Sequence, residues 1–221
     1  MASKTKSLLV LASIALVGCE DADPEPRFTL DDVNATAGET ESWSFDEDSA
    51  GALPADASVF VGSWAVRAED GAPSDPHAVC QTADEDYPGL QLGSTVYGDG
   101  TFKTRFKPIS GDTDQAAGIL FRVQDAENYY ILRANALEGN VAFYLYGDGG
   151  REQMGEDGEV HVANGAWQEL AVVVRGKHFT ALLNGEEVLT HNDESYVAGG
   201  VGLWTKADSH TCFDNVEALA E

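Results

Sequence analysis

Residues 118–147, GILFRVQDAENYYILRANALEGNVAFYLYG, decide the fold. They predict three consecutive antiparallel strands, at residues 118–124, 129–135 and 141–146, separated by the polar turns DAEN and LEGN. Apolar side chains alternate with other side chains along each strand. A period of two between turn residues is typical of a sheet that buries one face, so we predict a meander with its apolar face in the core.

The opposite face of this predicted meander is unusual because it carries arginines and tyrosines instead of Glu, Ser and Thr. We predict that it binds a ligand. The predicted ligand-binding residues are Arg122, Arg133, Tyr144 and Trp204, supported by Tyr146, Asn135 and Lys206. Aromatic rings stack on sugars, and arginines bond hydroxyls or carboxylates. The alternative is a solvated face whose arginines pair with nearby acids. Trp204 and Lys206 reach this face only if the strand 199–206 belongs to the same sheet.

A second basic strand is expected in the same sheet at residues 101–107, where Lys103, Arg105 and Lys107 would face outward. Of the 13 Lys and Arg residues, Lys4 and Lys6 precede residue 19 and leave eleven. The three basic residues of this strand, together with Arg122, Arg133 and Lys206, would place six of those eleven on one face.

The whole chain has 221 residues and a formal net charge of −25, which suit one large β domain that stays in solution. Such a charge repels nucleic acid and anionic membrane surfaces, so we expect no nucleic-acid partner. Adaptation to a salty or extracellular setting explains the acidity more simply than an acidic binding role does.

The N-terminus predicts export. Lys4 and Lys6 precede an apolar run, and Leu-Val-Gly-Cys ends at Cys19 in a pattern that resembles a bacterial lipobox. This resemblance implies a signal peptide at residues 1–18, a lipidated Cys19, and attachment to a membrane of the bacterial cell envelope, facing the periplasm or the cell surface. The alternative is an ordinary signal peptide with an incidental cysteine. Residues 19–40 would form an acidic tether and residues 41–221 the folded domain.

Two cysteines remain in this predicted exported chain, Cys80 and Cys212. Disulfides persist outside the cytosol, so we predict that these two residues form one. The alternative is a pair of buried thiols.

Further strand signals recur from residue 41 to residue 219, and no long helical pattern interrupts them. They include the run around Trp43, residues 63–67, 78–82 and 167–175, and the Asn184-Gly185 turn. Many short strands at this spacing predict an all-β fold, a two-sheet antiparallel β-sandwich or jelly roll.

The segments FKTRFKPISGDTDQAAGILFR, GAWQELAVVVRG and GGVGLWTKADSHTCFDNVEAL resemble the concanavalin A-like lectin/glucanase jelly roll, in particular the bacterial 3-keto-disaccharide hydrolase domain. The resemblance covers about residues 42–218. It implies two packed antiparallel sheets, one of them concave, with carbohydrate as the usual ligand. Two features depart from the superfamily. The chain lacks the Glu-x-Asp-x-x-Glu strand of family 16 glucanases, and Cys212 stands where an aromatic residue is expected.

Three function classes follow from these observations. The first is a membrane-anchored lipoprotein that binds carbohydrate, the second a glycoside hydrolase acting on 3-keto-disaccharides or related glycosides, and the third a structural or accessory envelope lipoprotein. No GxSxG, HExxH or P-loop motif indicates another enzyme class. Asp208 and His210 are weak candidates for general acid and base.

No cofactor is expected, although the resemblance implies that a structural calcium ion is possible. Asp46, Asp48 and Asp214 could supply its oxygen ligands. The alternative for all three is that they are exposed loop acids.

Overall fold

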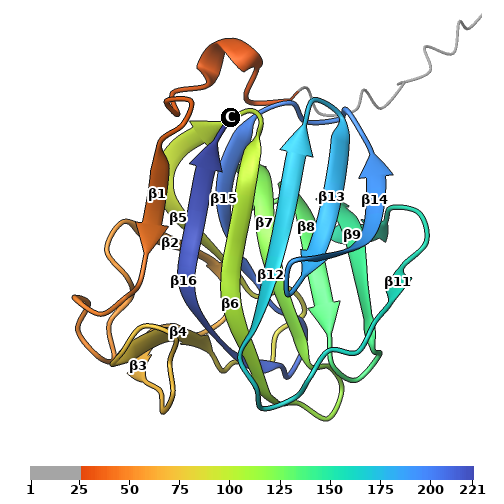
Figure 1. Ribbon diagram of the computed structural model, residues 1–221. Coiled ribbons are helices and arrows are strands. Elements are labelled where there is room, and N and C mark those ends of the chain that lie inside the picture. The colour runs from red at the N-terminus through yellow and green to blue at the C-terminus, as the bar shows by residue number, and fades with distance from the viewer. Residues whose placement is uncertain (1–25) are drawn as a thin grey trace, which may run out of the picture.

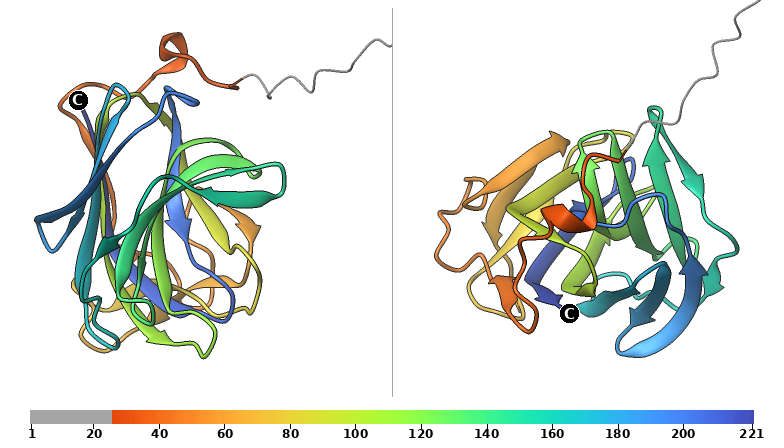
Figure 2. Two further views of the ribbon diagram at one scale, coloured as in Figure 1. Left: turned by 90° about the vertical axis from the view of Figure 1, so that its right-hand side faces the viewer. Right: turned by 90° about the horizontal axis from the view of Figure 1, so that it is seen from above.

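Two antiparallel sheets of eight strands each pack face to face in the computed structural model, which describes residues 26–221. Figures 1 and 2 show the two layers. The predicted all-β, two-sheet jelly roll is therefore confirmed. Within residues 26–221 the helical content is a single 3₁₀ turn, η1 (Leu30–Asp32), and no helix there is long and apolar enough to cross a bilayer.

Sheet A has the strand order β14-β13-β12-β6-β16-β4-β3, with β1 paired to β16. Its strands are β1 (Thr40–Trp43), β3 (Trp64–Ala68), β4 (His77–Gln81), β6 (Gly100–Ser110), β12 (Gln168–Arg175), β13 (His178–Leu183), β14 (Glu186–Asn192) and β16 (His210–Ala220). Most of this sheet lies in front in Figure 1.

Sheet B has the order β10-β9-β8-β7-β15-β5-β2, with β11 paired to β9. Its strands are β2 (Ala57–Val61), β5 (Gly89–Tyr97), β7 (Ala116–Asp125), β8 (Asn128–Asn135), β9 (Asn140–Gly147), β10 (Gly150–Gln153), β11 (Gly158–Glu159) and β15 (Gly199–Trp204). The predicted meander is β7-β8-β9. The strand at residues 199–206 joins the same sheet beside β7, as the placement of Trp204 required.

The main core lies between the two sheets. Phe121, Tyr130 and Phe143 of sheet B surround Phe179 of sheet A, with ring centroids 5.1, 5.1 and 6.0 Å from the Phe179 ring. All four side chains are fully buried. Burial of large aromatic surfaces stabilises the sandwich and holds the two sheets in one relative position.

The strand β6 lies in sheet A, between β12 and β16, and not in the meander's sheet. Lys103, Arg105 and Lys107 therefore leave the predicted binding face, which corrects the expectation of six basic residues on one face. Lys103 pairs with Glu217 at 3.0 Å, and Lys107 pairs with Glu69 at 2.7 Å. The alternation of this strand is compatible with either sheet, because both sheets have one face away from the core.

Of the predicted tether, the structure describes residues 26–40, and this segment contacts the sandwich. The Arg27 guanidinium and the Phe28 N–H donate hydrogen bonds to the backbone and side-chain oxygens of Gln124, at 3.2 and 2.9 Å. The Val96 N–H donates to the Asn34 side chain at 2.8 Å. The predicted signal peptide and Cys19 lie outside the described residues.

The predicted disulfide between Cys80 and Cys212 is confirmed, with an S–S distance of 2.00 Å. The two cysteines face each other on the paired strands β4 and β16. Both are fully buried in a small cluster against Ile109 and Trp167. The bridge joins positions 132 residues apart in the chain and so ties the early part of sheet A to its last strand.

Candidate functional site

A second cluster of rings lies on the face of sheet B that points away from sheet A. We call it the aromatic-basic cluster, and it consists of Tyr87, Arg133, Tyr144, Tyr146, Arg151, Trp204 and Lys206. Strand register places Trp204 near Arg133, because Trp204 on β15 pairs with Gly118 on β7, and Gly118 pairs with Arg133 on β8. The Trp204 ring lies against Gly118, where an added Cβ would come within 3.2 Å of the ring. A glycine at this position therefore makes room for the indole.

Cations and rings alternate within the aromatic-basic cluster. The guanidinium carbons of Arg133 and Arg151 lie 5.3 and 4.2 Å from the centre of the Tyr144 ring. Arg151 is also 5.4 Å from the Trp204 ring, and the Lys206 ammonium is 4.8 Å from the Tyr87 ring. Each of these distances is within the range of a cation–π interaction.

Burial divides the aromatic-basic cluster into a base and an exposed layer. Trp204 is 0% exposed, Arg133 is 1% exposed and Tyr144 is buried. The exposed layer consists of Tyr87, Tyr146, Arg151 and Lys206, all of which are half-buried. Arg133, Tyr144 and Trp204 thus lie on the outer side of sheet B, as predicted, but they lie beneath other side chains and support the surface instead of forming it.

Sequence reasoning missed two members of the exposed layer, Tyr87 and Arg151. Tyr87 lies in the loop before β5, and its ring stacks on Trp204 and meets Tyr146 edge-on, at centroid distances of 6.4 and 5.3 Å. Arg151 lies on β10, a short strand that follows the predicted meander. The Asp148-Gly149 pair between β9 and β10 is the signal that could have revealed this hairpin, because Asp-Gly is typical of tight β-turns.

The buried Arg133 is tied to polar groups at the end of β8. It donates hydrogen bonds to Glu138 at 2.9 Å and to the Asn140 side chain at 2.6 Å. Burial opposes ionisation of Glu138, but the hydrogen bond and the charge of Arg133 outweigh it and lower the pKa of that carboxyl. Asn140 in turn donates to Asp157. The charge of Arg133 is therefore largely balanced within the protein.

The buried carboxyl of Asp114 lies near the basic residues of the cluster. The Asn135 amide donates to it at 2.5 Å, so the predicted ligand residue Asn135, which is fully buried, acts as a support. Burial raises the pKa of the Asp114 carboxyl, and the positive charges of Arg133, Arg151 and Lys206 offset only part of that rise. A buried carboxyl whose pKa is raised can act as a general base when it faces a bound ligand.

Asp208 and His210, the predicted acid–base candidates, lie in separate environments. Asp208 accepts hydrogen bonds of 2.7–3.1 Å from the backbone N–H groups of residues 112–114, and these bonds lower its pKa. It therefore anchors the loop that carries Asp114. His210 lies near Arg67 and Glu69, and burial and the charge of Arg67 lower its pKa.

Arg122 points away from the aromatic-basic cluster, which corrects its predicted place beside Arg133. Arg122 lies in a bulge of β7 and has a φ of +48°. Beyond Phe121 the side chains therefore point to the opposite face of the sheet from the one that simple alternation predicts. The guanidinium donates to the backbone oxygens of Tyr196 and Gly176 at 2.8 and 2.7 Å and pairs with Asp99 at 3.4 Å.

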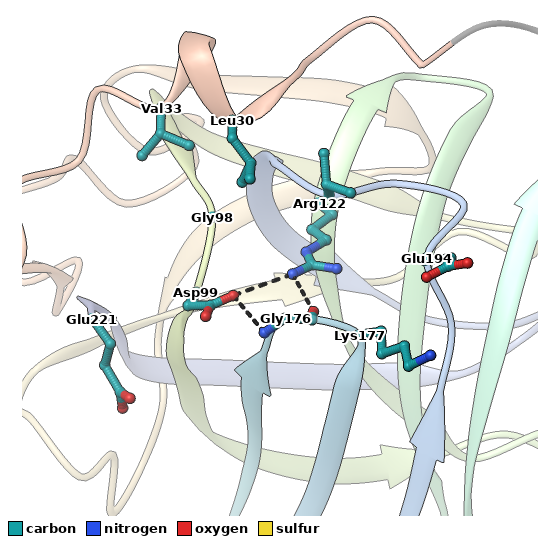
Figure 3. Close-up of a pocket in the computed structure, with 10 residues that line it drawn as sticks. Leu30, Val33, Gly98, Asp99, Arg122, Gly176, Lys177, Glu194 and Glu221 are labelled. Carbon is teal, nitrogen blue, oxygen red and sulfur yellow. Dashed lines mark hydrogen bonds and ion pairs between the residues drawn. The ribbon is translucent and has the colours of Figure 1, made fainter.

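Figure 3 shows Arg122 in a pocket of about 590 Å³ at one end of the sandwich. The walls come from η1, from the turn between β12 and β13, and from the segment before β15. The lining residues are Leu30, Val33, Gly98, Asp99, Arg122, Gly176, Lys177, Glu194, Val197 and Glu221. Because Arg122 is held by three partners of the protein itself, it acts here as a structural bridge between the sheets.

The three predicted calcium ligands do not converge. Asp214 is fully buried and accepts hydrogen bonds from the N–H and hydroxyl of Ser74, at 2.7 and 2.8 Å. Asp46 accepts from the His77 N–H, and Asp48 accepts from the Ala55 N–H. Among residues 26–221, the one close group of potential ligands is Glu69 with the two disulfide-bonded cysteines. The three carboxylates therefore do not fit a shared calcium site.

The aromatic-basic cluster belongs to a domain of a known class. Residues 34–218 match the 3-keto-alpha-glucoside-1,2-lyase-like domain, and the chain belongs to that family. No curated protein matches the chain in sequence.

Solved structures confirm the fold. The carbohydrate binding module CBM66 from Bacillus subtilis aligns with a TM-score of 0.63 and 20% identity, over 73% of this chain and 94% of the module. A protein of unknown function with a galectin-like fold, also from Bacillus subtilis, aligns with a TM-score of 0.55 and 12% identity, over 75% of this chain and 91% of its own. The Crh5 transglycosylase aligns with a TM-score of 0.55 and 12% identity, over 83% of this chain and 85% of its own. At these identities the likeness concerns the sandwich alone.

Proposed function

We propose that this domain binds a glycoside on the aromatic-basic cluster. The observation that carries the proposal is the exposed layer itself, in which half-buried Tyr87 and Tyr146 lie beside Arg151 and Lys206. Sugars present apolar faces that stack on aromatic rings and hydroxyls that accept hydrogen bonds from cationic side chains. The family description, which refers to an α-glucoside, supports the same class of ligand.

The buried base gives this surface its rigidity. Tyr146 stacks on the fully buried Tyr129 with ring centroids 4.7 Å apart and an interplanar angle of 4°. Tyr87 rests on Trp204. Rings held by buried partners lose little conformational entropy when a ligand stacks on them, and such preorganised contacts bind better than mobile ones.

We expect Tyr87→Ala and Tyr146→Ala to weaken glycoside binding about tenfold or more, since truncation of an aromatic anchor often costs about 2 kcal/mol. Isothermal titration calorimetry against α-glucosides and 3-keto-α-glucosides would measure the loss. Tyr87→Phe and Tyr146→Phe keep the rings and should bind nearly as well as the parent. Trp167→Ala, in the loop just before β12 and remote from the cluster, is the control for the loss of a partly exposed ring. Normal binding by both alanine variants would exclude this surface as the site.

A second candidate function is cleavage of the bound glycoside, which the lyase-like family description and the position of Asp114 favour. A 3-keto group acidifies the proton on the neighbouring C2. A base that removes this proton allows a C1–C2 double bond to form while the C1–O bond breaks, and the released alkoxide takes up a proton. Asp114 is our candidate for the base, and Arg151 and Lys206 would stabilise the negative charge that develops on the ketone oxygen.

Asp114→Asn should lower the rate of release of p-nitrophenol from p-nitrophenyl 3-keto-α-glucoside by about 100-fold or more, because a positioned general base contributes about that much. Asn can still accept the hydrogen bond from Asn135, so folding should be preserved, and circular dichroism would check this. An unchanged rate in the folded variant would exclude Asp114 as the base. The absence of release by the parent protein would leave binding as its function.

Anchoring of this domain to the bacterial envelope through Cys19 is also part of the proposal. The lipobox-like sequence before Cys19 supports it. A short linker from Cys19 to residue 26 would then hold the sandwich close to the membrane, where it could bind glycosides that pass through the envelope.

A further inference from the structure

We propose that the aromatic-basic cluster selects glycans that carry a carboxylate, as uronic acids do. This inference rests on the proposed glycoside binding and adds the charge of the ligand to it. It follows from two partly exposed cations of the cluster, Arg151 and Lys206, which make no ion pair within residues 26–221 and lie beside aromatic rings.

Three of the acids near the cluster already have partners in the protein. Glu138 pairs with Arg133, Asp157 accepts a hydrogen bond from Asn140, and Asp114 accepts one from Asn135. In contrast, Arg151 and Lys206 make no ion pair with any carboxylate of residues 26–221. Other basic residues of that part of the chain, such as Arg67 and Lys177, also lack an ion pair, but Arg151 and Lys206 differ from these two because each lies against an aromatic ring of the cluster.

The guanidinium groups also retain unused donors. Arg151 Nη1 and Arg133 Nε are buried and have no hydrogen-bond acceptor within the described part of the chain. Arg133 is itself 1% exposed, and both guanidiniums lie against the same Tyr144 ring. Buried donors are nearly always satisfied in folded proteins, so the half-buried Arg151 is the residue of this pair from which a bound ligand could accept a hydrogen bond, while Arg133 lies beneath it. An arginine N–H bonds a carboxylate oxygen more strongly than a neutral hydroxyl.

The electrostatics of the whole chain make such selection effective. A protein of net charge −25 repels anions, so an anionic ligand can bind only where local cations outweigh that field. Arg151 and Lys206 are the partly exposed cations of the cluster, and the rings of Tyr87 and Tyr146 lie beside them for the sugar itself. A carboxylated sugar therefore satisfies the unpaired cations and the exposed rings at the same time.

The test compares each uronic acid oligosaccharide with its methyl ester, because the two differ mainly in charge. Titration calorimetry of the full-length protein against a panel of such pairs, with neutral α-glucosides included, should show binding of a free acid at least tenfold tighter than that of its ester. The difference should shrink as salt is added. Arg151→Gln and Lys206→Gln should each reduce the ratio toward one. Arg67→Gln and Lys177→Gln remove the same charge from exposed positions outside the cluster and should leave the ratio unchanged.

Three outcomes would overturn the inference. Equal affinity for acid and ester would show that the surface binds glycans independently of their charge, and the proposed function would stand. A preference for the acid that survives both Arg151→Gln and Lys206→Gln would place the recognition elsewhere. Binding of neither uronates nor neutral glycosides would remove the proposed function together with the inference.

Discussion

Replacing Trp204 with alanine is expected to lower the free energy of unfolding by about 3–5 kcal/mol, the usual cost of truncating a large buried ring. Trp204 is 0% exposed and lies between the backbone at Gly118 and the rings of Tyr87 and Tyr144. Its removal would leave a cavity under the exposed layer, and Arg151 would lose one of the two rings on which its guanidinium lies. Glycoside binding should also weaken, because Tyr87 and Arg151 would lose the ring that holds them in place.

Urea unfolding at neutral pH would measure the loss, and Trp204→Phe should show a smaller one because a ring still fills most of the space. Tyr87→Ala, at a half-buried position of the same cluster, is the control that should cost clearly less. A free energy of unfolding within about 0.5 kcal/mol of the parent for Trp204→Ala, the range typical of surface substitutions, would show that Trp204 is exposed in solution.

Removing the disulfide should have an effect of similar size. Cys80 and Cys212 are 132 residues apart, and closing a loop of that length is expected to stabilise the folded state by about 4–5 kcal/mol through the entropy of the unfolded chain. Cys80→Ala together with Cys212→Ala removes the bridge and places a small apolar residue at each fully buried position. The double variant should therefore unfold at a much lower urea concentration than the parent.

Reduction gives an independent measurement of the same quantity. Dithiothreitol should shift the unfolding of the parent toward that of the double variant and leave the double variant unaffected. A decrease of less than about 1 kcal/mol on removal of the bridge would contradict the loop-closure account.

The fold could be predicted from sequence because its central meander repeats one simple pattern. Apolar alternation in residues 118–147 and two polar turns were sufficient to define β7, β8 and β9, and the cysteine count in a chain predicted to be exported was sufficient to pair Cys80 with Cys212. These are short-range signals or counting arguments, and each depends on few assumptions about the rest of the chain.

The site could be predicted only in part, because three of its determinants are non-local. The bulge at Arg122 reverses the sides of β7, and alternation alone does not reveal a bulge. The assignment of β6 to sheet A depends on pairing with β12 and β16, which follow much later in the chain. The loop that carries Tyr87 and the hairpin that carries Arg151 cover Trp204, and outward orientation on a strand does not mean exposure when other segments fold over that face.

The central claim is that ligands bind on the outer face of sheet B, and mapping by nuclear magnetic resonance tests it most directly. The parent protein would be labelled with ¹⁵N and titrated with the glycoside or uronic acid oligosaccharide that binds most tightly. The account predicts that the largest shift changes fall on the backbone amides of Tyr87, Tyr146, Arg151 and Lys206. Shift changes confined to the pocket around Arg122, with none at those four residues, would contradict it.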